Sequence, residues 1–226
     1  MIVRDYMTPH PILVEPAMRV VDAQKLMTEN NIRHLPVVGN GKCLLGLVTH
    51  ARLAVPVERL ASLNVWEITR FLSDLTVRQM MLTGADLHTT QPDATLEEAA
   101  QLLIQNKLTG LVVVEPGGDA VIGIITDTDL LVELQNLLGA IDAGWRAVMR
   151  VPDRLGEFRK VARVIGDRNW GIMAMGSVRS PRQSGSWDII LKVRHCSREE
   201  LTAALTSIPG QELVDLRETL ATKTSQ

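Results

Sequence analysis

Two short stretches of the sequence carry hydroxyl and charged side chains at matching positions. One reads GIITDTDL and places Thr126 three residues before Asp129, and the other reads GLVTHARL and places Thr49 three residues before Arg52. Threonine and aspartate in the first turn of a helix either cap its free N–H groups or present a hydroxyl and a carboxylate to a ligand. The two stretches are therefore either a duplicated binding site with one altered copy or two similar strand-to-helix turns.

The sequence offers no arrangement typical of a catalytic centre. It contains no Ser-His-Asp order with supporting turns, no metal-spaced set of His, Cys and Asp, and no Walker or dinucleotide loop. Cys43 and Cys196 lie far apart, which favours a reduced cytosolic protein. We therefore expect no enzyme, no bound metal and no required cofactor. The scattered histidines are His10, His34, His50, His88 and His195.

Composition and charge indicate a globular protein of the cytoplasm. The chain has 226 residues, 46% hydrophobic and only 3% aromatic, and a formal net charge of −2. A nucleic-acid-binding face would need a strongly basic patch. The N-terminus has no signal-peptide h-region, and no apolar run approaches the ~20 residues that span a bilayer. We expect neither nucleic acid nor direct membrane insertion.

The two stretches end equivalent copies of a repeated unit of roughly 50 residues. VRDYM (residues 3–7) recurs as VRQMM (77–81), and NIRHLPVV (31–38) recurs as KLTGLVVV (107–114). Each unit is expected to fold as βαββα, with helical spacing of apolar residues after the first strand and nearly continuous apolar strands after the helix. Threonine at the following turn is a good N-cap. The expected strands are Ile12–Val14, Leu35–Val38 and Leu44–Val48 in the first unit, and Leu87–Thr89, Leu111–Val114 and Val121–Ile125 in the second; the expected helices are Val20–Asn30 and Leu96–Asn106.

The segment between the units is expected to continue the first unit's last helix and then form an amphipathic helix that packs on the pair. Its apolar stripe is Leu63, Val65, Ile68, Leu72 and Leu75.

The duplication resembles a tandem cystathionine-β-synthase (CBS) domain pair over about residues 1–135. The matching motifs are Ile32-Arg-His-Leu-Pro-Val-Val38 and Gly123-Ile-Ile-Thr-Asp-Thr-Asp129. This resemblance implies clefts between the repeats that bind adenosine ligands such as AMP, ADP, ATP or S-adenosylmethionine.

In such a pair, one repeat's Thr-x-x-Asp marks a slot that the other repeat completes. Asp129 would accept hydrogen bonds from both ribose hydroxyls, Thr126 lies where phosphate meets a helix N-terminus, and Arg33 could reach a phosphate. Ile12 and Ile32 would supply the apolar walls.

The other slot departs from the pattern because Arg52 replaces the ribose carboxylate, so we expect a weaker site or an empty one. His34 and His50 are further candidates for phosphate contact. The residues of this second slot would be Thr49, Arg52, Leu108 and Thr109.

From Trp145 onward the pattern predicts a ferredoxin-like βαββαβ domain. Its second helix has Ser197 as its cap and Glu200 at the capping-box position. The turn Asp153-Arg-Leu-Gly156 resembles the start of an ACT domain, a module that dimerises and often binds amino acids, so Asp153 and Gly156 are candidates for an effector turn. Leu155 and Gly171 depart from the ACT pattern, which favours subunit pairing over ligand binding.

The sequence therefore predicts an α/β (α+β) chain with three parts: 1–76 as the first CBS repeat with its connector, 77–140 as the second, and 144–226 as an ACT-like domain. The order resembles the acetoin-utilisation accessory protein group. This resemblance implies a homodimeric sensor that binds an adenine nucleotide or S-adenosylmethionine and regulates a further protein. The alternative is a ligand-free dimerisation module controlling a partner enzyme or transporter.

Overall fold

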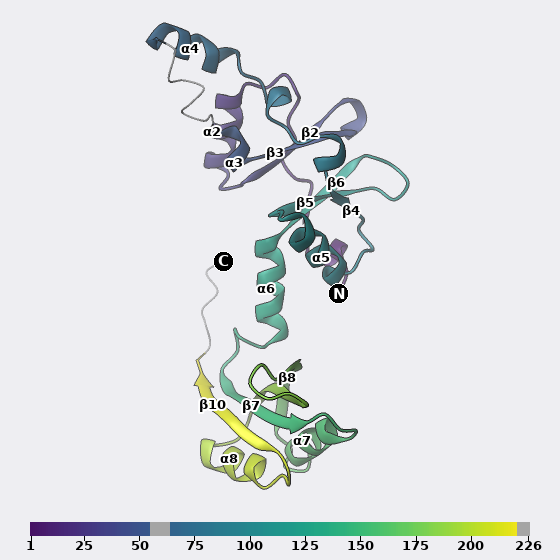
Figure 1. The fold of residues 1–226 in the computed structure, drawn as a ribbon, viewed down its shortest axis with the longest axis vertical. Helices are drawn as coiled ribbons and strands as arrows, with labels where there is room; N and C mark the ends of the chain where they lie inside the picture. Colours follow the sequence, from purple (N-terminus) through teal and green to yellow (C-terminus); the bar gives the residue numbers. More distant parts are fainter. Residues whose placement is uncertain (55–63, 221–226) are drawn as a thin grey trace. The chain divides into compact units, whose positions relative to one another are not determined.

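The computed structural model describes residues 1–54 and 64–220 and divides into two compact units, Met1–Leu130 and Leu131–Gln226 (Figure 1). The boundary between the units falls inside helix α6 (Asp127–Leu137). Within the described residues, no helix combines the length and the apolar character needed to cross a membrane.

The first repeat places a helix against a buried two-stranded sheet. In β2 every residue is buried, and the strand runs antiparallel to β3, with His34 opposite Thr49. The expected strand Ile12–Val14 is wrong, because only Val14 pairs there, through a single bridge to Val37. The elements are α2 (Val20–Glu29), β2 (His34–Val38), η1 (Asn40–Lys42), β3 (Leu44–Thr49) and α3 (His50–Leu53).

The second repeat forms a sheet of order β1-β6-β5-β4, in which β4 is parallel to β5. Helix α5 has the predicted bounds, and Thr95 and Glu98 form a capping box at its start. The expected strand Leu87–Thr89 is misplaced, because the observed strand is Thr89–Thr90. The elements are β1 (Thr8–Pro9), η4 (Gly84–Asp86), β4 (Thr89–Thr90), α5 (Leu96–Asn106), β5 (Gly110–Val114), β6 (Val121–Thr126) and α6.

The segments that precede the two repeats are exchanged between them. Val3 of α1 (Val3–Tyr6) is fully buried in the core of the second repeat, and Val77 of η3 (Val77–Gln79) in that of the first. Strand β1 pairs with β6, whereas Leu82 bridges to Leu47 of β3. Each repeat therefore borrows the leading segment of the other, which ties the pair into one unit.

The exchange explains the glycine of the Gly-x-x-Thr motif. A Cβ on Gly46 would lie 2.6 Å from the backbone oxygen of Leu82, and one on Gly123 would overlap the thioether of Met7. Both glycines leave room for the exchanged segment, so the repeated glycine serves packing between the repeats.

Among the described connector residues, those at the C-terminal end pack on the first repeat. Helix α4 (Val65–Asp74) is capped by Asn64 and Glu67, and it contributes no fully buried residue. Leu75 is buried in the first core, where Phe71 packs against it. Val65 is 77% exposed, so its assignment to the packed stripe is wrong. Leu63 lies outside the described residues.

The second unit has the predicted βαββαβ order and an antiparallel sheet of order β10-β7-β9-β8. Both helices cover one face of the sheet, where their apolar residues meet alternate residues of the central strands. Ser197 and Glu200 form the predicted capping box of α8. The elements are β7 (Gly144–Pro152), α7 (Glu157–Gly166), β8 (Gly171–Arg179), β9 (Ser186–Arg194), α8 (Arg198–Thr206) and β10 (Glu212–Thr219).

Candidate ligand-binding cleft

The five residues of the first predicted slot line a single cleft of 630 Å³ in the first unit. This volume lies within the ~300–1,000 Å³ range of small-molecule sites. The predicted residues are Ile12, Ile32, Arg33, Thr126 and Asp129. The other lining residues are Thr8, His10, Pro11, Asn30, Asn31, His34, Ile124 and Thr128.

The threonine and the aspartate at the start of α6 form a capping box. Asp129 Oδ2 accepts hydrogen bonds from the backbone N–H of Thr126 at 2.7 Å and from its hydroxyl at 2.8 Å, and Asp129 N–H donates to Thr126 Oγ1 at 3.3 Å. The capping interpretation is thus confirmed for this turn. It does not exclude ligand binding, because Asp129 Oδ1 has no protein partner within the described part of the chain. The cap orients the carboxylate and leaves one oxygen available.

Arg33 extends from the first repeat toward the start of α6. Its guanidinium donates to the hydroxyl of Thr128 at 3.2 Å and lies 3.9 Å from the carboxylate of Asp127. The Arg33 side chain is 63% exposed, so these contacts leave N–H groups free for an anion. The position suits a phosphate that approaches the N-terminus of the helix.

His34 lies at the junction of the two repeats. The residue is 7% exposed, and its Nε2 shares a hydrogen bond of 2.8 Å with the hydroxyl of Thr109. Burial and then the nearby Arg33 hold the pKa of His34 below its ordinary value, against the opposing effect of Asp127 and Asp129. His34 therefore favours the neutral form in the folded unit. His50 is exposed on α3 and does not line the cleft.

Acidification is expected to destabilise the first unit through His34. The unfolded chain takes up a proton near the ordinary pKa of 6.5, whereas the folded unit does so only at lower pH. The stabilising contribution of neutral His34 is therefore fully present above pH 6.5 and decreases as the pH falls below 6.5. The melting temperature should fall less between about pH 7.5 and about pH 5.5 in His34→Gln than in the unmodified chain. His50→Gln, at an exposed position, should show the same fall in melting temperature as the unmodified chain. An equal fall in all three proteins would contradict the assignment of the pH dependence to His34.

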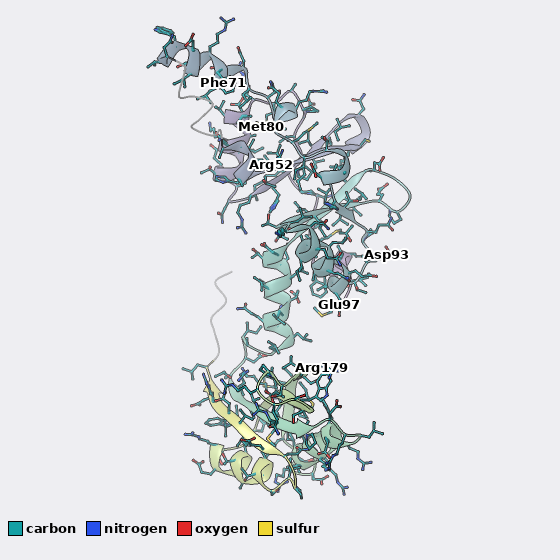
Figure 2. All side chains as sticks on the ribbon, viewed as in Figure 1. Arg52, Phe71, Met80, Asp93, Glu97 and Arg179 are labelled. Carbon is teal, nitrogen blue, oxygen red and sulfur yellow. The ribbon has the colours of Figure 1, made fainter. Side chains whose placement is uncertain are left out.

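The predicted second slot does not present the same groups. Arg52 Nε donates to the backbone oxygen of Met80 at 2.9 Å, and both residues are labelled in Figure 2. Thr49 lies at the predicted N-cap position of α3, but its side chain makes no capping hydrogen bond. Leu108 packs against the core of the second repeat, and Thr109 bonds His34. The turn therefore lacks the free carboxylate that Asp129 offers.

The turn proposed as an effector site in the second unit is shaped by its glycine. Gly156 has φ +87° and precedes α7, a conformation that favours glycine. The backbone N–H of Asp153 donates to the backbone oxygen of Gly185 at 2.9 Å. These contacts account for the turn itself, and an effector role remains a prediction.

Sequence reasoning missed several residues of the cleft. Thr8 and His10 enter it because the N-terminal segment is exchanged onto β6, which the repeat pattern alone did not indicate. Thr128 lies within the GIITDTDL stretch, and its neighbours already pointed to the site. Asn31 has φ +52° in the turn before β2, a left-handed position where asparagine is common.

Within residues 1–54 and 64–220, no group of three or more His, Cys, Asp or Glu side chains could hold a metal ion.

The CBS domain family profile matches residues 3–55 and 77–136, which together make up half of the chain. The chain therefore belongs to the CBS domain family. Its two matched segments correspond to the two repeats of the first unit.

Relatives share this CBS pair. The chloroplastic CBS domain-containing protein CBSX2 of Arabidopsis thaliana is 33% identical over 142 residues, 55% of this chain and 59% of CBSX2. A crystal structure described as acetoin utilization protein AcuB from Vibrio cholerae covers 62% of this chain and 93% of its own, at 32% identity and a TM-score of 0.50. A crystal structure of CBSX2 in complex with AMP covers 59% and 96%, at 28% identity and a TM-score of 0.48. The chain spans only 30% to 59% of the length of the first four curated relatives.

Proposed function

We propose that this chain is a non-catalytic regulatory sensor that binds one adenosine ligand in the 630 Å³ cleft of its CBS pair. The observation that carries the proposal is the convergence of Thr126, Asp129, Ile12, Ile32 and Arg33 on that cleft. These residues come from both repeats, so a ligand held there would contact both and favour one arrangement of the pair.

Each part of an adenosine ligand has a group to receive it. Asp129 Oδ1 is an acceptor for the ribose hydroxyls, and the capping box fixes its direction. Arg33 and the hydroxyl of Thr128 supply donors for a phosphate, and the start of α6 adds the partial positive charge of a helix N-terminus. Ile12 and Ile32 supply apolar walls for the base. AMP is the first ligand to test, because CBSX2 has been crystallised with it.

Regulation would pass from the CBS pair to the second unit. We assign that unit as an ACT-like domain on its βαββαβ order and its Gly156 turn, and propose that it pairs with a second copy of the chain. The protein whose activity changes would be a separate cytoplasmic partner. No substrate of this chain is needed for such a role.

Calorimetric titration of the full chain with AMP, ADP, ATP and S-adenosylmethionine tests the proposal. We expect saturable binding of at least one of them, and a rise in unfolding free energy of about 2.7 kcal/mol at a ligand concentration 100 times its Kd. Absence of binding at millimolar ligand would contradict the sensor and favour a ligand-free assembly module. Sedimentation would then show a dimer that is equally stable with and without AMP.

A further inference from the structure

The second unit leaves one face of its sheet without helices, and this face carries a row of arginines. On β7 the core residues Ala147, Met149 and Val151 are buried against the helices. Because side chains alternate along a strand, Arg146 and Arg150 lie on the opposite face. None of these positions belongs to the unit that contains the CBS pair.

One end of the arginine row is built around Asp188. Arg150 donates to its two carboxylate oxygens at 2.8 and 3.1 Å, and this pair is nearly buried, with side chains 13% and 11% exposed. Arg150 first, and more weakly Arg182, hold the pKa of Asp188 below its ordinary value, which places Arg182 at the same end. Arg182 is exposed in the loop between β8 and β9. Arg150 thus holds this carboxylate, and Arg182 lines the same cleft without an ion pair to Asp188 among the described residues.

At the other end of the row, two arginines contact the carboxylate of Asp215. Arg146 Nη1 donates to Asp215 Oδ2 at 3.2 Å, and Arg217 Nε donates to Oδ1 at 2.9 Å. Arg217 lies opposite Arg146 across the β7–β10 pair. A guanidinium has five N–H donors, so each arginine keeps several for another acceptor. The Arg146 end therefore carries one positive charge in excess, whereas at the Arg150 end Glu212, opposite Arg150 on β10, adds a second carboxylate.

A cleft of 560 Å³ joins the two ends, and its apolar lining residues are Val148, Pro181 and Val214. Arg146 and Arg150 are four residues apart on one strand, which separates their Cα atoms by about 13 Å. The cleft therefore has arginines at both ends and, over its lining side chains, two more positive charges than negative ones. The carboxylates hold Arg146, Arg150 and Arg217 in place before any ligand arrives.

We propose that this cleft binds a small molecule with two oxyanion groups, either carboxylates or phosphates, one held at each arginine pair. Bidentate guanidinium contacts match the geometry of both anions. The interspersed Asp188 and Asp215 disfavour a long polyanion, because it would meet fixed negative charge along its length.

The cleft adjoins the start of the second unit. Lys192 lies opposite Arg146 on the same open face, is 1% exposed and donates to the backbone oxygens of Gly139 and Asp142. The segment that follows α6 is thereby fixed beside the arginine row. An anion that neutralises the row would act next to this attachment.

Calorimetry on the full chain with succinate, adipate and pyrophosphate tests the inference, with acetate as the single-charge control. We expect at least one of these three probes, each with two anionic groups, to bind measurably and acetate not to bind. Arg182→Gln and Arg217→Gln should each weaken binding about tenfold, through loss of charge-assisted hydrogen bonds. The preferred probe, dicarboxylate or pyrophosphate, would distinguish a carboxylate ligand from a phosphorylated one. Arg159→Gln, an exposed arginine on α7 that does not line the cleft, should bind as the unmodified chain does.

Two results would overturn the inference. One is that succinate, adipate and pyrophosphate all fail to bind at about 10 mM in low salt, where charge attraction is strongest. The other is a loss of binding affinity in Arg159→Gln equal to that in Arg182→Gln and Arg217→Gln. Such a result would mean that the probes are attracted to a basic surface in general and not to this cleft. AMP binding should persist in Arg182→Gln and Arg217→Gln, and dianion binding should persist in Asp129→Ala, so failure of one site is separable from failure of the other.

Discussion

Replacing Asp129 with alanine is expected to weaken AMP binding by about 100-fold, because two hydrogen bonds from ribose hydroxyls to a charged acceptor are lost. Asp129→Asn should also bind weakly, since the amide keeps an oxygen but loses the charge. Isothermal titration calorimetry at constant ionic strength measures both changes. The effect should be confined to this carboxylate, because Glu133 on the same helix does not line the cleft. Glu133→Gln therefore serves as the matched control and should bind AMP normally.

The loss must be separated from a general weakening of α6. Asp129 also completes the capping box with Thr126, and loss of a capping residue costs about 1 kcal/mol of stability. Melting temperatures of Asp129→Ala and Thr126→Ala without ligand give the size of that cost. If Asp129→Ala binds AMP as tightly as the unmodified chain, the carboxylate is only a helix cap.

The second large effect is expected at Gly46. An alanine there places its Cβ 2.6 Å from the backbone oxygen of Leu82, and a backbone atom can move only if the exchanged segment moves with it. Overpacking of this kind costs about 1–3 kcal/mol. Gly123→Ala is the matched comparison, because its Cβ meets the flexible side chain of Met7, which can rotate away. Urea unfolding should therefore show a larger loss for Gly46→Ala than for Gly123→Ala.

A control keeps this comparison specific to close packing. Gly118→Ala lies in the turn before β6, where an added Cβ meets nothing within 4 Å. Its stability should stay close to that of the unmodified chain. A loss at Gly118 as large as at Gly46 would mean that the sequence change itself, and not contact with the exchanged segment, destabilises the unit.

The repeat and most of its elements could be predicted from the sequence because local patterns specify them. The apolar spacing and the Thr95 capping box define α5, and the nearly continuous apolar run defines β5. The free carboxylate at Asp129 could be predicted too, since its difference from Arg52 is visible by comparing the two copies.

The exchange of leading segments could not be predicted, because it is a property of long-range pairing. Val3 and Val77 occupy equivalent places in the repeat, and nothing local says which core each enters. For the same reason Thr8 and His10 were absent from the predicted site. The expected strand Ile12–Val14 failed because only Val14 finds a partner, although the residues have strong strand propensity.

The open face of the second sheet also escaped sequence reasoning. Arg146 and Arg150 lie on one strand, but only the pairing of β7 with β10 and β9 brings Arg217 and Asp188 beside them. Sequence alone identified the βαββαβ order and the Ser197 cap of α8, which depend on local residues.

A crystal structure of the full chain grown with saturating AMP tests the central claim most directly. We predict one AMP per chain in the 630 Å³ cleft, with the ribose hydroxyls within hydrogen-bond distance of Asp129 Oδ1 and the phosphate near Arg33 and Thr128. The turn that contains Arg52 should hold no nucleotide. A nucleotide bound at the Arg52 turn while the Asp129 cleft stays empty would contradict the account.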